Sequence, residues 1–197
     1  ERAAHMVNQL LSMARAEAKA QARAPEAVDL AALSRETVRD FVPKAMDKRI
    51  DLGYEGPDDG QPLHGTLMGQ PTLVRELVRN LVDNALHYTP HGGVVTARML
   101  VDRFSGVQVL QVEDDGPGIA ADERELVLEP FYRALGTNVD GSGLGLAIVR
   151  QIAGQYGATL EMEDTHPGRP QRRGLRVSVR FAPTRADQSK PGRPGRF

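Results

Sequence analysis

Two asparagines stand one helical turn apart in the stretch NLVDNALHYTP, where most of the other residues are apolar. On a helix of about 100° per residue, Asn80 and Asn84 fall in one polar arc, with Asn84 at its edge. The arc consists of Glu76, Asn80, Asp83, Asn84 and His87. Mg²⁺ is typically held by a few oxygen atoms together with water and substrate phosphates, and amide oxygens are neutral ligands of this kind. The pair predicts a site for a phosphate-bound Mg²⁺, and asparagines that merely face solvent are the alternative.

A carboxylate follows an apolar strand in VLQVEDDGPGI, residues 109–119. Leu110 and Val112 share one face of the strand, and Asp114 is the next position on that face. A carboxylate there can accept a hydrogen bond from a buried donor such as the adenine amino group. The glycines that follow let the backbone approach a flat ligand closely. An ordinary turn is the alternative, because Asp-Gly-Pro-Gly is also typical of turns.

Three glycines alternate with other residues in GSGLGLAIV, just before an apolar helical pattern. Gly141, Gly143 and Gly145 free the backbone N–H groups at a helix N-terminus to meet phosphate oxygens. The stretch is not a Rossmann fingerprint, because Leu146 stands where that pattern needs glycine, and a P-loop would require a following Lys-Ser/Thr. A tight turn at the start of a helix is the alternative.

The segment between these two elements, EPFYRALGTNVDGSG, begins with aromatic residues and continues as a glycine-bounded polar loop. Residues 133–143 have neither helical nor strand periodicity. Their position between two candidate nucleotide contacts favours a lid that orders over the ligand, and a plain surface loop is the alternative.

The composition excludes several classes of function. The chain has 197 residues with 26 acidic and 25 basic side chains, so its overall charge does not favour nucleic acid. It has no cysteine, which excludes a disulfide scaffold and a thiolate metal site. No apolar run approaches the ~20 residues of a membrane helix, and no signal peptide opens the chain. Because Glu1 already stands in helical register, we expect a fragment of a longer protein.

Periodicity and turn residues predict the elements that position these groups. We expect helices over residues 1–22, 28–49, 71–88, 122–128 and 144–157, and strands over 50–55, 62–68, 94–102, 106–114, 158–163 and 175–181. The first two strands are expected to form a hairpin. The order predicts an α+β fold, a two-layer sandwich of a mixed, mostly antiparallel sheet with helices on one face, preceded by one long helix. The tail, residues 183–197, is basic and lacks the apolar content to fold.

The order and spacing of these motifs resemble the catalytic and ATP-binding domain of sensor histidine kinases. This domain has a Bergerat-type fold and belongs to the GHKL superfamily, shared with gyrase, mismatch-repair and heat-shock ATPases. ELVRNLVDNALHYTP is similar to the N box of the family, DDGPGI to its first glycine box, PFYR to its F box and GSGLGL to its second glycine box. The resemblance covers about residues 28–182 and implies ATP and Mg²⁺ as ligands.

The resemblance also implies roles for individual residues. Asn84 is the main Mg²⁺ ligand with Asn80 in support, and Asp114 reads the adenine amine. The full set of implied ATP contacts is Asn80, Asn84, His87, Tyr88, Asp114, Gly116, Gly118, Ile119, Arg133, Gly141, Gly143, Leu144 and Gly145. Glu76 is the candidate catalytic base, with a solvated charge near the metal as the alternative. The family often has Lys or Arg where His87 stands, so a phosphate contact there would depend on pH near ~6.5.

Residues 1–24 resemble the second helix of the family's dimerisation hairpin. The phosphoacceptor helix is absent, and His5 does not fit it because Met-Val-Asn follows. The resemblance implies a kinase that transfers the ATP γ-phosphate to a histidine outside this fragment and thence to a response-regulator aspartate. We therefore expect no autophosphorylation by the fragment alone.

Further expectations concern the parent protein. It is expected to be a homodimer and an inner-membrane sensor that holds this domain in the cytoplasm. Contact with nucleic acid, or of this fragment with the membrane, is not expected. Two other functions stay open, a GHKL-type ATPase clamp and a catalytically degenerate nucleotide-binding module.

Overall fold

The computed structural model describes residues 24–57, 67–102, 104–132, 142–169 and 172–182. The predicted first helix, most of the predicted lid and the tail lie outside the described residues, as do Arg133 and Gly141. Within the described part of the chain, no helix combines the length and apolar character needed to cross a membrane.

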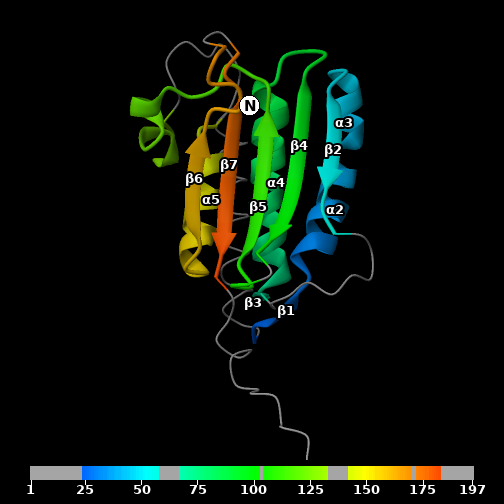
Figure 1. Ribbon diagram of the computed structural model, residues 1–197, viewed down its shortest axis with the longest axis vertical. Coiled ribbons are helices and arrows are strands. Elements are labelled where there is room, and N and C mark those ends of the chain that lie inside the picture. The colour runs from blue at the N-terminus through cyan, green and yellow to red at the C-terminus, as the bar shows by residue number, and fades with distance from the viewer. Residues whose placement is uncertain (1–23, 58–66, 103, 133–141, 170–171, 183–197) are drawn as a thin grey trace, which may run out of the picture.

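A five-stranded sheet forms one layer of the molecule (Figure 1). Its strands, in spatial order, are β2 (Asp51–Glu55), β4 (Val94–Val101), β5 (Gln108–Asp114), β7 (Leu175–Phe181) and β6 (Thr159–Glu163). β2 runs parallel to β4, and every other neighbouring pair is antiparallel. The predicted mixed, mostly antiparallel sheet is confirmed.

Helices form the second layer, on one face of this sheet (Figure 1). They are α2 (Leu30–Asp40), α4 (Pro71–Tyr88) and α5 (Gly145–Gln155), with the short α3 (Val42–Asp47) beside the β2 edge. Two 3₁₀ turns, η1 (Ala121–Glu123) and η2 (Leu126–Leu128), replace the short helix predicted over residues 122–128. This arrangement confirms the predicted α+β fold.

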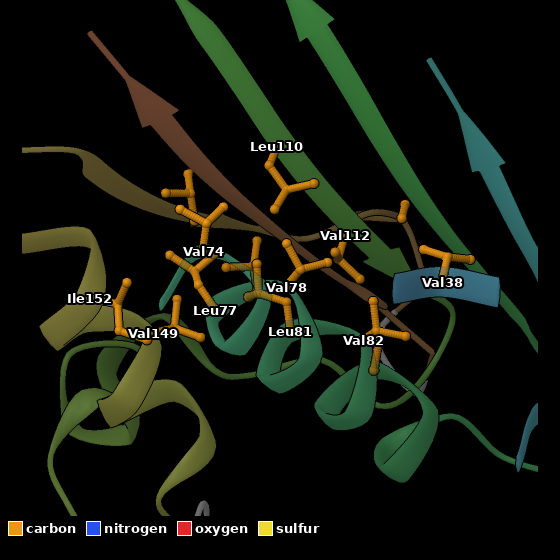
Figure 2. Packing of buried hydrophobic residues seen from close by; sticks show 14 of the residues in the cluster. Val38, Val74, Leu77, Val78, Leu81, Val82, Leu110, Val112, Val149 and Ile152 are labelled. Atoms are coloured by element: carbon orange, nitrogen blue, oxygen red, sulfur yellow. The ribbon is translucent and has the colours of Figure 1, made fainter. Parts of the chain in front are cut away.

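The long helix α4 occupies the centre of the core. Its apolar residues recur at spacings of three and four, and Pro71 suits the first turn because its missing N–H has no intrahelical partner there. Figure 2 shows these side chains between Leu110 and Val112 of β5 and Val149 and Ile152 of α5. The side chains of α4 that are fully enclosed are Val74, Leu77, Val78, Leu81, Val82 and Leu86. The predicted bounds of this helix, residues 71–88, are confirmed.

The opposite face of the sheet carries a row of charges of alternating sign. Ion pairs connect Glu55 to Arg98, Arg98 to Glu113, Glu113 to Arg176 and Arg176 to Glu163, so that the row crosses all five strands. Glu113 lies in the middle strand and is buried beneath its two arginine partners. None of the helices in the described part of the chain covers this face, and the paired charges let it meet water.

The predicted hairpin is wrong. β3 (Leu67–Gly69) pairs with β1 (Glu26–Val28) in a separate two-stranded sheet, whereas β2 pairs with β4. Parallel strands need a long crossover connection, and the chain between β2 and β4 supplies one that contains α4. The turn-rich residues after β2 therefore belong to a crossover.

The predicted helix over residues 28–49 is divided. Val28 belongs to β1, and Asp29 then caps α2 by accepting a hydrogen bond from the Ala32 N–H at 2.9 Å. The helix ends at Asp40, and α3 starts with Pro43 in its first turn. Proline cannot continue a helix, because it lacks the N–H and its ring clashes with the carbonyl four residues earlier.

We expect Leu77→Ala to lower the free energy of unfolding by about 2–5 kcal/mol, because it leaves a cavity between the sheet and the helices. Leu100→Ala is the matched control, since Leu100 lies on the uncovered face with 47% of its surface exposed and should lose less than about 1 kcal/mol. Urea denaturation of both variants checks this. Equal losses would contradict the position given to α4.

Candidate functional site

The two asparagines of α4 turn their amide oxygens toward the start of α5. The Asn80 side-chain amide donates to the Glu76 carbonyl oxygen at 2.8 Å and to Glu76 Oε1 at 3.1 Å, so its oxygen faces away from its own helix turn. A Cβ placed on Gly145 would lie 3.4 Å from Asn84 Oδ1 and 3.7 Å from Asn80 Oδ1. Two neutral oxygens thus converge on the first residue of α5.

The start of α5 has no side-chain cap. Helix N-termini leave up to four backbone N–H groups without intrahelical partners, and together with the helix dipole these favour an anion. A bulky residue in place of Gly145 would narrow the space between these N–H groups and the asparagine oxygens. The arrangement therefore suits a phosphate at the helix start and a cation between that phosphate and the amide oxygens.

A backbone hydrogen bond connects the chain just before residues 133–141 to the chain just after them. The Phe131 N–H donates to the Gly143 carbonyl at 2.9 Å, and the Leu144 N–H donates to Ser142 Oγ at 3.3 Å. Gly143 has φ of +69°, and a Cβ there would lie 2.8 Å from the Tyr132 carbonyl oxygen. Glycine is required at this position for both reasons.

Asp114 ends β5 as a buried carboxylate, with 7% of its surface exposed. Its Oδ1 accepts hydrogen bonds from the Gly116 N–H at 2.9 Å and the Leu175 N–H at 3.3 Å. Burial raises the pKa of Asp114 to about 6, and the nearby charge of Asp115 adds to the rise while the two hydrogen bonds oppose it. The strand face predicted for this residue is confirmed, because Leu110 and Val112 on the same face are in the core.

The turn after Asp114 lies against the end of α4. A Cβ on Gly116 would lie 3.0 Å from both the Tyr88 carbonyl oxygen and Asp114 Oδ1, so only glycine fits without a shift. The half-buried Tyr88 ring packs edge-on against His87, with 5.1 Å between ring centroids. Ile119 packs against the core. Tyr88, Asp114 and Gly116 therefore lie together at the end of α4 and β5.

Gly174, directly before β7, supports this turn and was not predicted as a site residue. The Gly174 N–H donates to the Gly116 carbonyl at 3.0 Å, and a Cβ on Gly174 would lie 2.3 Å from the Asp114 carbonyl oxygen. Gly118 approaches from the other side, where its own Cβ would lie 2.8 Å from the Gly174 carbonyl oxygen. A glycine directly before the alternating pattern of residues 175–181 was the available signal for such close backbone approach.

An ion pair beside this turn was also missed. Asp115 Oδ2 binds Arg172 at 2.5 Å, and Asp115 Oδ1 accepts a hydrogen bond from the Val94 N–H at 3.0 Å. Asp115 thus joins the start of β4 to the segment that precedes β7. Because Arg172 lies far along the chain from Asp115, local sequence patterns carried no signal for this contact.

The residues of the polar arc of α4 face different partners. Asp83 pairs with Lys44 of α3, whereas Asn80 and Asn84 face the start of α5. Among the described residues, no group of three or more His, Cys, Asp or Glu gathers as a metal site. Asn80 and Asn84 offer two neutral amide oxygens to a cation at this place.

Residues 69–185 match the family described as histidine kinase-, DNA gyrase B-, and HSP90-like ATPase. The sensor protein QseC of Salmonella typhi is 35% identical over 169 residues, which are 85% of this chain and 35% of QseC. The sensor protein kinase PmrB of Pseudomonas aeruginosa is 33% identical over 97% of this chain and 38% of PmrB. The chain therefore spans little more than a third of the length of these relatives.

Solved structures share the fold. The mycobacterial sensor histidine kinase MprB superposes with a TM-score of 0.69 at 26% identity, over 81% of this chain and 97% of that one. Full-length ShkA, solved in complex with AMPPNP, gives a TM-score of 0.71 at 27% identity, over 91% of this chain and 36% of ShkA. These findings confirm the resemblance that the order of motifs indicates. The chain belongs to the histidine kinase-, DNA gyrase B-, and HSP90-like ATPase family, and its relatives within that family are sensor histidine kinases.

Proposed function

We propose that this chain binds Mg-ATP and presents the γ-phosphate for transfer to a histidine outside the chain, from which a response-regulator aspartate receives the phosphoryl group. The observation that carries the proposal is the convergence of the Asn80 and Asn84 amide oxygens on the uncapped start of α5. Family membership over residues 69–185 supports it, and so does the AMPPNP complex of ShkA.

The base of the nucleotide is assigned to the end of β5. The carboxylate of Asp114 accepts a hydrogen bond from the adenine amino group, and Gly116 and Gly118 form the backbone wall beneath the ring. Tyr88 and Ile119 flank it. The burial of Asp114 and the close backbone contacts of Gly116 support this assignment, because a buried acceptor beside a glycine turn suits a flat ligand with one outward amine.

The phosphates are assigned to the start of α5. Backbone N–H groups from Gly143 to Gly145 donate to phosphate oxygens, and Arg133, Gly141 and His87 remain predicted contacts. Asn84 is the main ligand of Mg²⁺, with Asn80 beside it. The residues fit this ion because neutral amide oxygens add no negative charge next to a triphosphate. An ion bound by Asn84 and Asn80 would supply positive charge that offsets the charge of the phosphate oxygens.

Glu76 was predicted as the catalytic base. Its carboxylate accepts the hydrogen bond from the Asn80 amide, which supports a positioning role in which Glu76 keeps the Asn80 oxygen turned toward the ion. The base assignment stays a prediction. Only the base role requires the carboxylate, because a Glu76→Gln variant keeps the shape and an oxygen that can accept from the Asn80 amide but cannot take up a proton.

The whole protein is assigned by analogy with its relatives. We propose that the parent protein is a homodimer and that residues 28–182 form its catalytic domain, whereas the predicted roles of residues 1–24 and 183–197 stay predictions. The parent is proposed to be an inner-membrane sensor that keeps this domain in the cytoplasm. The relatives named as sensor proteins support this, as does the solved cytoplasmic segment of QseC.

We expect Asn84→Ala to weaken Mg-ATP binding by about 10–100-fold, the usual effect of losing groups that organise a metal site. Binding of ADP without Mg²⁺ should change far less. Asp83→Ala is the matched control, because Asp83 neighbours Asn84 on α4 but pairs with Lys44. Calorimetric titration measures all three proteins, and equal Mg-ATP affinity for wild type and Asn84→Ala would refute the metal assignment.

Nucleotide affinity should fall as pH drops below about 6, where Asp114 takes up a proton in the free protein and its protonated oxygen no longer accepts from the amine. The expected loss is about tenfold per pH unit in the limit of full protonation. Asp114→Asn should bind more weakly and lack this component. Because ATP titrates in the same range, the difference between the two proteins is the measurement, and parallel pH profiles would contradict the assignment.

A further inference from the structure

Three backbone carbonyls at the end of α4 converge on one ammonium group. Lys48 Nζ donates to the carbonyl oxygens of Leu86 at 2.6 Å, His87 at 3.1 Å and Thr89 at 2.9 Å. The last carbonyls of a helix lack intrahelical partners and carry the negative end of the helix dipole, so a cation is favoured there. Lys48 itself is distant in sequence and only half-buried.

The chain makes a tight left-handed turn directly after Lys48. Arg49 has φ of +54°, a left-handed conformation that is unfavourable for a residue with a Cβ. It closes α3 in the manner of a Schellman motif, in which the Arg49 N–H donates to the Met46 carbonyl and the Ile50 N–H donates to the Ala45 carbonyl, both at 2.9 Å.

The main chain of Lys48 holds the turn that follows α4. The Lys48 carbonyl accepts a hydrogen bond from the Gly92 N–H at 3.3 Å. Main chain and side chain of one residue thus bind both ends of the segment from Leu86 to Gly92. A helix cap alone would need only the side-chain contacts.

The segment that Lys48 holds forms a wall of the proposed base site. The carbonyls on either side of Tyr88 are bound by the ammonium, and the Tyr88 carbonyl itself lies against the Gly116 turn. The same turn donates the Gly116 N–H to Asp114. The direction of the Tyr88 carbonyl therefore depends on its two neighbours, and the position of the turn beside Asp114 depends on that carbonyl.

We propose that Lys48 is a positioning residue for the nucleotide site, which fixes the end of α4 so that Tyr88 and the Gly116 turn form a preorganised wall for the base. This inference rests on the proposed function, because it needs a nucleotide in that place. It adds a residue outside all four motifs, and it locates the effect at the base and away from the metal.

The test is Lys48→Met, which keeps the length of the side chain and removes the ammonium. Because the effect lies at the base, Mg-ATP and Mg²⁺-free ADP should lose affinity by the same factor, about tenfold, the lower end of what outer-shell partners contribute at metal sites. Lys44→Met is the matched control, since Lys44 stands one turn earlier on α3 and pairs with Asp83. Its affinity for both nucleotides should stay that of wild type.

Affinities are measured by calorimetry at a temperature where circular dichroism shows each variant folded. A folded Lys48→Met with unchanged affinities and a lower melting temperature would overturn the proposal, because Lys48 would then be a stability cap only. If Lys48→Met does not fold, Lys48→Arg decides. It keeps a cation at the helix end, but its planar fork of donors matches three carbonyls that converge on one point less well than an ammonium does. About threefold weaker ADP binding is therefore expected, and unchanged binding overturns the proposal.

A second experiment tests whether a free cation can replace the lost ammonium group at the three carbonyl oxygens. In Lys48→Ala, ammonium or potassium ions added to the buffer should restore ADP affinity, because a free cation can occupy the place of the lost ammonium. Lys44→Ala should bind ADP with the affinity of the wild type, whether or not these ions are added. Absence of nucleotide binding by the wild-type chain would instead refute the proposed function, so the two failures are distinguishable.

Discussion

The packing of α4 against both the sheet and the neighbouring α5 is the interaction on which the remaining structure depends. One side of this helix fills the core with Val74, Leu77 and Val78, and its rim carries the two asparagines. A rotation of the helix that moved the amides would expose the valines and leucines, so the core fixes the direction of the amide oxygens. The start of α5 then meets those oxygens because α5 packs on the same helix.

At the end of β5, the buried carboxylate of the candidate site lowers the stability of the fold. Ionised Asp114 is buried, and its raised pKa means that the fold favours the protonated form. Its stabilising contribution is therefore present below the ordinary value of 3.8 and is lost as pH rises through about 6, a cost on the order of 2–3 kcal/mol at neutral pH. Such a carboxylate is more typical of a binding site than of a core, and the ion pair of Asp115 with Arg172 holds the adjacent turn in place.

The sequence predicted the long, strongly periodic elements. It did not predict strands that are too short to show a period or contacts between residues that are far apart along the chain. The bounds of α4 followed from its apolar spacing and Pro71. β1 and β3 have three residues each, too few to show a period, and their pairing joins segments that no local turn connects. The asparagines were found because they stand one turn apart in the polar arc of a mostly apolar helix, and Asp114 because it is a polar residue on the apolar face of a strand. Arg172 and Lys48 act through ion-pair and backbone contacts that appear only in three dimensions.

The central claim is that this chain presents ATP for phosphoryl transfer to a histidine in a separate helix. In the most direct measurement, the chain is incubated with Mg²⁺, γ-labelled ATP and a separately made hairpin that carries the acceptor histidine, and the label on the hairpin is measured. The account predicts acid-labile, base-stable label on the hairpin that depends on the presence of this chain. Label released only as inorganic phosphate, as an ATP-hydrolysing clamp would produce, or label that stays on ATP would contradict it.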